Sequence, residues 1–275
     1  MSWSTIRIGP RPYIAVDHAG DGEFVLFLHG IGGNRRNWHP QLPAFSPHVL
    51  AVAWDARGYG DSDDYDGPLA FSDYADDVPR VLAHFGQTRA HIVGLSMGGR
   101  IAMDLAVRYP GLVETLTLCD THRGFARFSD ADRADFVRLR KAPLLAGAEP
   151  RDVAVPVAKS LIGPMAVPGA FEQLVDSLSR LHKASYIKSI EASVLGDTSV
   201  DLAAIDVPTH VVVGADDPLT PPAVAAEIAG AIAGARLTII PDAGHLSNIE
   251  QPELFNAAVL GFIQEHMRAG AGDRA

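Results

Sequence analysis

Cysteine is nearly absent from this chain of 275 residues, since Cys119 is the only one. A single cysteine cannot form an intramolecular disulfide, so a disulfide framework is excluded. Because Cys119 ends an apolar stretch, we interpret it as a small buried hydrophobic residue. No cluster of His, Cys, Asp or Glu has the spacing of a metal site, so no metal is expected.

The sequence also lacks the features of a membrane protein or a nucleic-acid binder. No apolar run is long enough to cross a bilayer, and the N-terminus has no long apolar segment of the kind found in signal peptides. We therefore expect a cytoplasmic protein. The net charge of −10 argues against a nucleic-acid or membrane partner. The hydrophobic content of 47% is enough for a globular core.

A cofactor motif is missing as well. The glycine-rich loop His29-Gly30-Ile31-Gly32-Gly33 follows an apolar run, as phosphate-binding loops do. However, no Lys-Ser/Thr pair follows it, and the G-x-G-x-x-G order is absent. Gly98-Gly99 belongs to no dinucleotide fingerprint either. We expect a reaction that runs without a cofactor.

What the chain does contain is an alternation of strand-like apolar runs and helical segments. This alternation predicts an α/β fold: a mainly parallel sheet with helices on both faces. An edge hairpin is expected at Ile6 to Ala15, where prolines interrupt the apolar pattern. The other predicted strands are Phe24–Leu28, Val49–Trp54, Ala90–Leu95, Val113–Cys119, Thr209–Val213 and Arg236–Ile240, and the predicted helices are Trp38–Phe45, Phe71–Phe85, Ile101–Tyr109, Pro222–Ile232 and Pro252–Met267.

Residues 121–196 differ from the rest because they contain no clear strand. They consist of amphipathic pieces, which we expect to be broken by prolines at positions 143, 150, 156, 164 and 168. We predict a helical lid inserted between two strands of the main sheet. The predicted domains are therefore an α/β core, residues 1–120 and 197–275, and a lid, residues 121–196.

The stretch Gly94-Leu95-Ser96-Met97-Gly98 joins a predicted strand to a predicted helix. In a G-x-S-x-G turn the backbone at the serine is strained, and the flanking glycines let strand and helix approach closely. The hydroxyl then projects at the carboxyl end of the sheet, where ligands bind in α/β folds. A plain turn with the serine as N-cap is the alternative interpretation, and the partners elsewhere in the chain argue against it.

Two further loops after strands carry Asp217 and His245. The order Ser, Asp, His is that of a catalytic triad on an α/β sheet. A serine hydroxyl needs an adjacent imidazole to take its proton, and the imidazole needs a carboxylate to orient it. Taken singly, each residue is an ordinary loop residue. Their coincidence at successive strand ends, in this order, predicts a triad of Ser96, Asp217 and His245.

Over nearly its whole length the sequence resembles the α/β-hydrolase superfamily. Within that superfamily it is most similar to 3-oxoadipate enol-lactonases and their carboxylesterase relatives. The resemblance implies the α/β-hydrolase fold, the triad above and no cofactor. It is carried by the segments Leu28-His29-Gly30, Asp55-Ala56-Arg57-Gly58-Tyr59-Gly60-Asp61-Ser62, Gly94-Leu95-Ser96-Met97-Gly98-Gly99, Gly214-Ala215-Asp216-Asp217-Pro218 and Gly244-His245. In the second segment, Asp55 and Arg57 are expected to pair locally and to have no chemical role.

The resemblance also guides the choice of acid and of oxyanion donors. In the family pattern the acid stands three residues after the glycine that ends the strand, which selects Asp217 over Asp216. Asp120 ends another strand, where some family members place the acid, and it ranks lower. The backbone N–H of Met97, after the nucleophile, is one predicted oxyanion donor. The family points to Ile31 for the second, while His29 is expected to shape that loop.

The lid has 11 Lys and Arg against 8 Asp and Glu, a charge of +3, whereas the remaining chain carries −13. A basic lid over an acidic body is expected to attract an anionic substrate. Arg35, Arg123 and Arg127 are the predicted substrate-binding residues, with Arg36 a further candidate beside the oxyanion loop. The alternative is that most of these charges are solvated and that the lid's apolar residues hold an uncharged ester.

These observations favour a serine hydrolase that cleaves a small-molecule ester or lactone, a carboxylate-bearing enol-lactone being one candidate. The same triad also serves a C–C bond (meta-cleavage product) hydrolase, an amidase, an acyltransferase or a perhydrolase. From another class, a ligand-binding receptor on a hydrolase scaffold remains an alternative. The sequence leaves open whether the chain forms a homo-oligomer.

Overall fold

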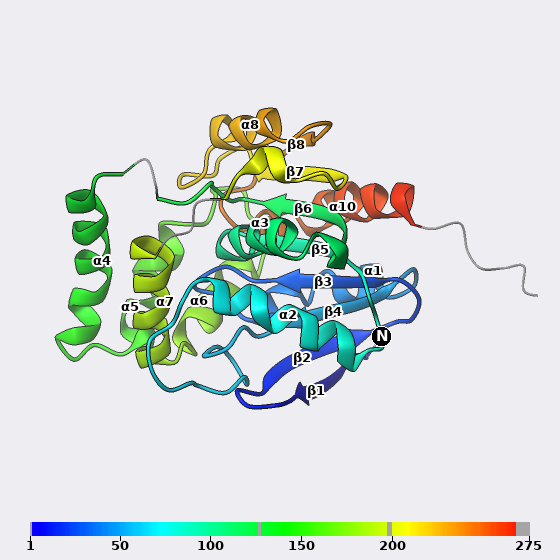
Figure 1. The fold of residues 1–275 in the computed structure, drawn as a ribbon. Helices are drawn as coiled ribbons and strands as arrows, with labels where there is room; N and C mark the ends of the chain where they lie inside the picture. The colour runs from blue at the N-terminus through cyan, green and yellow to red at the C-terminus, as the bar shows by residue number, and fades with distance from the viewer. Residues whose placement is uncertain (1, 126–127, 197–199, 268–275) are drawn as a thin grey trace, which may run out of the picture.

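The protein folds around one eight-stranded sheet, seen in a computed structural model that describes residues 2–125, 128–196 and 200–267 (Figure 1). The strand order is β1-β2-β4-β3-β5-β6-β7-β8. β2 pairs antiparallel with β1 and β4, and every other pairing is parallel. The strands are β1 (Ser4–Ile8), β2 (Ile14–Ala19), β3 (Phe24–Leu28), β4 (Leu50–Trp54), β5 (Ala90–Leu95), β6 (Val113–Cys119), β7 (Thr209–Gly214) and β8 (Arg236–Ile240).

Helices cover both faces of this sheet, so the predicted fold class is confirmed. The core helices are α1 (Leu42–Phe45), α2 (Ser72–His84), α3 (Met97–Arg108), α8 (Pro222–Ala231), α9 (Ser247–Glu250) and α10 (Pro252–His266). Three short 3₁₀ helices are η1 (Arg35–Trp38), η2 (Pro110–Leu112) and η3 (Leu202–Ala204). No helix in the described part of the chain combines the length and the apolar character needed to cross a membrane.

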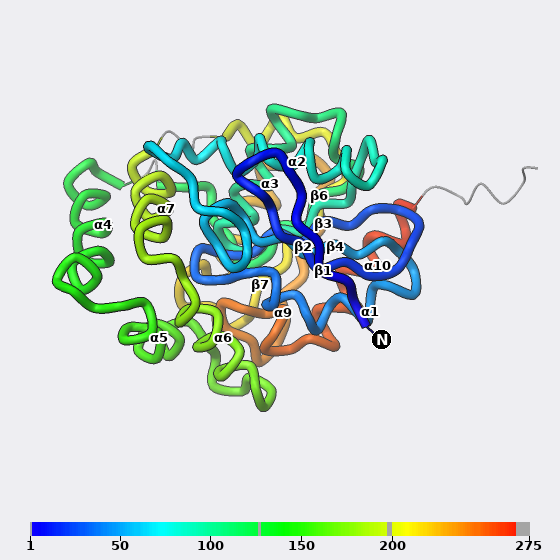
Figure 2. The backbone as a smooth tube through the Cα atoms, turned by 90° about the horizontal axis from the view of Figure 1, so that it is seen from below, coloured from blue at the N-terminus to red at the C-terminus, as the bar shows by residue number. Residues whose placement is uncertain are grey.

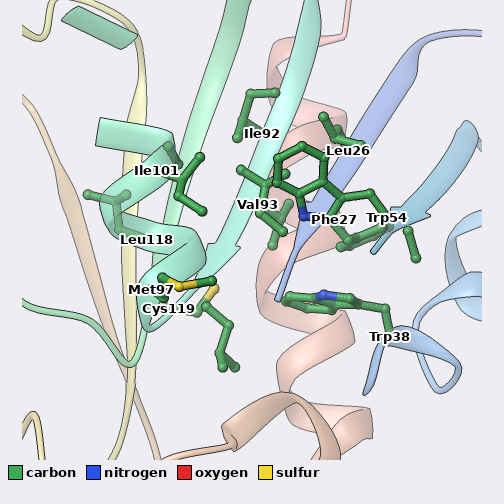
Figure 3. Close-up of a cluster of buried hydrophobic side chains, with 14 of the residues drawn as sticks. Leu26, Phe27, Trp38, Trp54, Ile92, Val93, Met97, Ile101, Leu118 and Cys119 are labelled. Carbon is green, nitrogen blue, oxygen red and sulfur yellow. The ribbon is translucent and has the colours of Figure 1, made fainter. Parts of the chain in front are cut away.

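The core lies where the central strands meet the helices. All residues of β3, β5 and β7 are buried, as their continuous apolar runs predict for strands covered on both faces. Figure 3 shows side chains of β3, β5 and α3 meeting the rings of Trp38 and Trp54 in one apolar cluster. The ring of Phe27 packs against Trp38 at 5.0 Å between centroids and against Phe45 at 5.2 Å. These contacts hold β3 against the segments that carry Trp38 and Phe45.

Four helices lie between β6 and β7 in the chain: α4 (Asp130–Leu145), α5 (Pro150–Lys159), α6 (Ala170–Ser179) and α7 (Lys183–Leu195). Both backbone views place them together on one side of the core (Figures 1 and 2). We refer to residues 121–196 as the lid. The lid is attached to the core at buried positions: the guanidinium of Arg100 on α3 donates to the Ser193 carbonyl at 2.8 Å, and the Tyr74 and Ser189 hydroxyls lie 2.7 Å apart.

The expectation that prolines break the lid helices is wrong at two positions. Pro143 lies within α4 and Pro156 within α5. Pro143 is in the last turn of α4, so only Leu144 and Leu145 follow it in the helix. Pro156 lies mid-helix, between Ala154 and Ala158, which are buried in the hydrophobic core. Pro150 begins α5, as prolines often begin helices.

Candidate active site

Ser96 occupies a sharp turn between β5 and α3. Leu95 ends the strand, Met97 begins the helix, and Ser96 between them has φ 55° and ψ −113°. A positive φ is uncommon for a residue with a side chain, and such strained residues cluster at functional sites. The turn directs the Ser96 hydroxyl away from the core, so the local conformation is that expected of a nucleophile.

The glycines on either side of Ser96 allow this turn to form. A Cβ atom at Gly94 would overlap the carbonyl oxygen of Gly98. A Cβ atom at Gly98 would overlap the carbonyl oxygen of Leu28, at the end of β3. Both glycines are therefore required by the close approach of α3 to the strands, which is what brings Ser96 beside the loop after β3.

The three predicted triad residues lie within hydrogen-bond distance of one another. Nε2 of His245 is 3.0 Å from Oγ of Ser96, and Nδ1 of His245 is 2.9 Å from Oδ2 of Asp217. His245 and Asp217 are 4% and 3% exposed. Ser96 follows β5, Asp217 follows β7 and His245 follows β8, so the sheet topology unites residues far apart in the chain.

The pKa values of the acid and the imidazole move in opposite directions. Burial acts to lower the pKa of His245, but the hydrogen bond and negative charge of Asp217 outweigh it, and the pKa rises above 6.5. Burial acts to raise the pKa of Asp217, but the hydrogen bond from His245 outweighs it and the pKa falls below 3.8. Asp217 is therefore ionised at neutral pH and stabilises a charged His245.

Neither alternative acid contacts the imidazole. The side chain of Asp216 is exposed. The buried carboxylate of Asp120 instead accepts from the Gly214 N–H at 2.8 Å, the Ser247 N–H at 3.1 Å and the Ser247 hydroxyl at 2.6 Å. Burial and the nearby charge of Asp217 raise its pKa to about 7. Asp120 thus joins the end of β7 to the loop that carries His245.

The loop after β3 lies beside Ser96, as expected for an oxyanion loop. Ile31 lines a cavity together with Ser96, and the N–H of Met97 is at the start of α3, where helix N–H groups lack intrahelical acceptors. His29 shapes this loop: its Nδ1 donates to the Gly30 carbonyl at 2.8 Å, and its Nε2 accepts from the Ala56 N–H at 3.0 Å. Burial lowers the pKa of His29 to about 4, so the ring is neutral.

The sequence analysis did not identify two supporting residues, Glu250 and Thr220. The buried carboxylate of Glu250 accepts from the N–H groups of Gly163, Gly244 and Leu246 at 2.7 to 2.9 Å. The Thr220 hydroxyl donates to Oδ2 of Asp217 at 2.6 Å. Each lies a few residues after a triad member, and a search for polar residues at that spacing would have found them.

The structure gives Arg35 a role that differs from the predicted one. Its side chain is buried, with Nε 2.9 Å from Asp17 and the other guanidinium nitrogens paired with Asp55 and Asp61. The guanidinium organises the turn after β4 and is not available to a substrate. Arg36 points outward and pairs with Asp176 at 3.2 Å. The expected local pairing of Asp55 with Arg57 is also wrong, because Arg57 pairs with Asp77 at 2.7 Å.

Two cavities open at Ser96 and His245. The larger, of about 540 Å³, is lined by lid residues and α8, and Arg123 is part of its wall. Arg127 lies outside the described residues. The smaller, of about 80 Å³, is lined by the oxyanion loop and by leucines. Across the described ranges, no group of three or more His, Cys, Asp or Glu side chains is arranged to hold a metal ion.

Comparison with known proteins identifies the fold family. The model of the alpha/beta hydrolase fold family matches residues 23–252. The chain belongs to the alpha/beta hydrolase fold family. Among curated members of that family, it is 33% identical over 272 residues to "Putative non-heme bromoperoxidase BpoC" of Mycobacterium tuberculosis, covering 91% of this chain and 97% of the relative.

Two other alpha/beta hydrolases carry names of ester or lactone chemistry. The 3-oxoadipate enol-lactonase 2 of Acinetobacter baylyi is 28% identical over 261 residues, which is 90% of this chain and 92% of the relative. The solved structure of a thermophilic esterase from Thermogutta terrifontis superposes with a TM-score of 0.82 at 26% identity, covering 97% of this chain and all of that one. The fold and the hydrolase family are thus established, while these relatives differ in their named reactions.

Proposed function

We propose that this alpha/beta hydrolase is a serine hydrolase that cleaves a carboxylic ester or lactone through an acyl-enzyme. The observation that carries the proposal is the pair of hydrogen bonds linking Asp217, His245 and Ser96. The strained backbone of Ser96 and the adjacent oxyanion loop support it. The names of the lactonase and esterase relatives agree with this substrate class.

In the proposed reaction Oγ of Ser96 attacks the carbonyl carbon while Nε2 of His245 takes the hydroxyl proton. The N–H groups of Met97 and Ile31 stabilise the oxyanion of the tetrahedral intermediate. His245 then gives its proton to the leaving oxygen, which leaves an acyl group on Ser96. Water attacks this acyl group while His245 takes a proton from the water, and His245 then gives that proton to Oγ of Ser96 as the acid departs. Asp217 keeps the imidazole oriented and stabilises its charge throughout.

Replacement of the nucleophile tests the proposal. In Ser96→Ala, kcat for short p-nitrophenyl esters should fall by about a millionfold, as in other triad enzymes. A fluorophosphonate probe should label the wild type stoichiometrically and leave the variant unlabelled. Circular dichroism checks that the variant is folded. Ester hydrolysis near the wild-type rate in a folded Ser96→Ala protein would refute the assignment, and probe binding without turnover in the wild type would favour a receptor.

A further inference from the structure

Ser96 stands between two cavities of very different size. The larger has about 540 Å³ and the smaller about 80 Å³, and both have Ser96 and His245 in their walls. A scissile carbonyl held at Ser96 carries one substituent on its acyl side and one on its alcohol side. If one substituent enters each cavity, the two substituents meet very different limits on size.

The smaller cavity has room for only a short group. Its volume is less than a sixth of that of the larger cavity. The wall is mainly apolar, with Trp38, Leu95, Leu174 and Leu246 all buried. Among the described residues no Asp, Glu, Lys or Arg side chain lines it. The chemistry of this wall suits a short uncharged alkyl group.

The residues that line the small cavity are themselves held in place by packing contacts. The ring of Trp38 packs against Phe27 at 5.0 Å and against Phe255 at 6.1 Å between centroids. A Cβ atom at Gly32 would lie 2.6 Å from the side chain of Leu178, so the oxyanion loop already touches α6. Expanding a well-packed wall by one methylene is costly. The small cavity is therefore expected to reject longer chains.

We propose that the small cavity is a size filter, walled on the lid side by Leu174 of α6, that restricts one of the two substituents of the substrate to a short chain. The other substituent lies in the larger cavity and is tolerated at greater length. This inference rests on the proposed function, because it takes Ser96 as the point of attack. It names the substrate class as open-chain esters with one short apolar substituent.

Two ester series test the filter. The acyl series runs from p-nitrophenyl acetate to the octanoate, and the alcohol series runs from methyl to octyl esters of phenylacetic acid. We expect kcat/KM to fall in one series only, by about tenfold or more for the first carbon beyond the limit, since a methylene in an apolar pocket discriminates by roughly 10- to 200-fold. The series that shows the limit identifies the side that enters the small cavity.

Variants of the wall then assign the limit to Leu174. Leu174→Ala should move the limit outward by one or two carbons, and Leu174→Phe should move it inward. The matched control is Leu105→Ala, which truncates an equally buried leucine on α3 that does not line the small cavity. The control should leave the limit unchanged. Thermal melting of each variant verifies folding, and Leu174→Phe remains informative if the alanine variant is unstable.

Labelling by fluorophosphonates of increasing alkyl length separates this inference from the proposed function. These reagents need a reactive Ser96 but no turnover. No labelling at any length, together with no ester hydrolysis, would overturn the serine hydrolase itself. If the protein is labelled and hydrolyses esters, three outcomes would overturn the filter alone. The first is a length limit in both ester series, and the second is a limit in neither. The third is a limit in one series that Leu174→Ala and Leu174→Phe leave unchanged.

Discussion

At the scale of single residues, the carboxylate of Asp217 is fixed by four hydrogen bonds. Oδ1 accepts from the N–H groups of Leu219 at 2.8 Å and Thr220 at 2.9 Å. Oδ2 accepts from the Thr220 hydroxyl at 2.6 Å and faces Nδ1 of His245 at 2.9 Å. Because only an acceptor fits at Oδ2, the contacts select the imidazole tautomer with its proton on Nδ1. Nε2 is then free to accept from Ser96.

Exchange of the acid for an amide should therefore disable the imidazole. In Asp217→Asn we expect kcat to fall by roughly four orders of magnitude, as when the wrong histidine tautomer forms in other triads. Asp216→Asn is the matched control, because the neighbouring side chain is exposed and should leave kcat nearly unchanged. Steady-state kinetics on one ester compares the two variants. A larger loss in Asp216→Asn would reverse the assignment.

The raised pKa of His245 predicts the acid side of the pH profile. When the pH falls through this pKa, Nε2 becomes protonated and cannot take the proton of Ser96, so kcat/KM should decline. The apparent pKa of this decline is expected above 6.5. In Asp217→Asn the residual activity should show a lower midpoint, because the main cause that raises the pKa is removed. A wild-type midpoint clearly below 6.5 would contradict the coupling.

At the scale of elements, α3 can approach β5 closely because Gly94 and Gly98 have no Cβ atoms. Gly98 lies against the carbonyl of Leu28, and Gly94 lies against the first turn of α3. No side chain larger than hydrogen fits between these backbones. The position of Ser96, the proposed nucleophile, is thus set by the approach of a helix to two strands, and not by contacts of Ser96 alone.

Adding one methyl group at this junction should have a large effect. We expect Gly98→Ala to lower the free energy of unfolding by about 1–3 kcal/mol, because the added methyl overpacks the junction. It should also lower kcat by displacing Ser96. Gly111→Ala is the control, since a Cβ atom there meets nothing within 4 Å, and it should change stability by less than about 0.5 kcal/mol. Urea denaturation measures the free energy of unfolding of both variants. Equal values for Gly98→Ala and Gly111→Ala would refute the packing argument.

The sequence predicts an element well when the residues that determine it are neighbours in the chain. β5, β6 and β8 begin and end where their apolar runs predict, and the hydrogen-bonded triad follows the motif order. The environment of Arg35 could not be predicted, because its partners Asp17 and Asp61 lie on other elements. Similarly, the position of Pro156 inside α5 depends on helix packing, which the sequence around Pro156 does not reveal.

At the scale of the whole molecule, charge is distributed unevenly between lid and core. The lid carries +3 and the remainder −13. In the lid, Arg138, Lys141 and Arg180 pair with carboxylates. Arg123 and Arg140 line the larger cavity, and neither forms an ion pair with another described residue, although Glu227 lines the same cavity. On the described part of the wall, two guanidinium groups and one carboxylate line the cavity, which favours an anionic group of the substrate there.

We therefore predict a preference for a carboxylate-bearing ester over its methyl-capped analogue. Because Arg140 is exposed, the gain should be modest, about two- to fivefold in kcat/KM, and it should shrink with added salt. Arg140→Gln should remove the preference. Arg138→Gln, on the same helix but 64% exposed and outside the cavity wall, should retain it. A capped analogue that performs equally well at low and high ionic strength would point to a neutral substrate.

One contact between lid and core bears on how such a protein can diversify. The backbone N–H of His245 donates to the carbonyl of Leu161 at 2.9 Å, so a loop of the lid supports the chain at the proposed general base. A lid exchanged for that of another hydrolase would have to supply a carbonyl at the same point. Substrate range and reaction rate are consequently inherited together, because Leu161 both lines the small cavity and holds the backbone at His245.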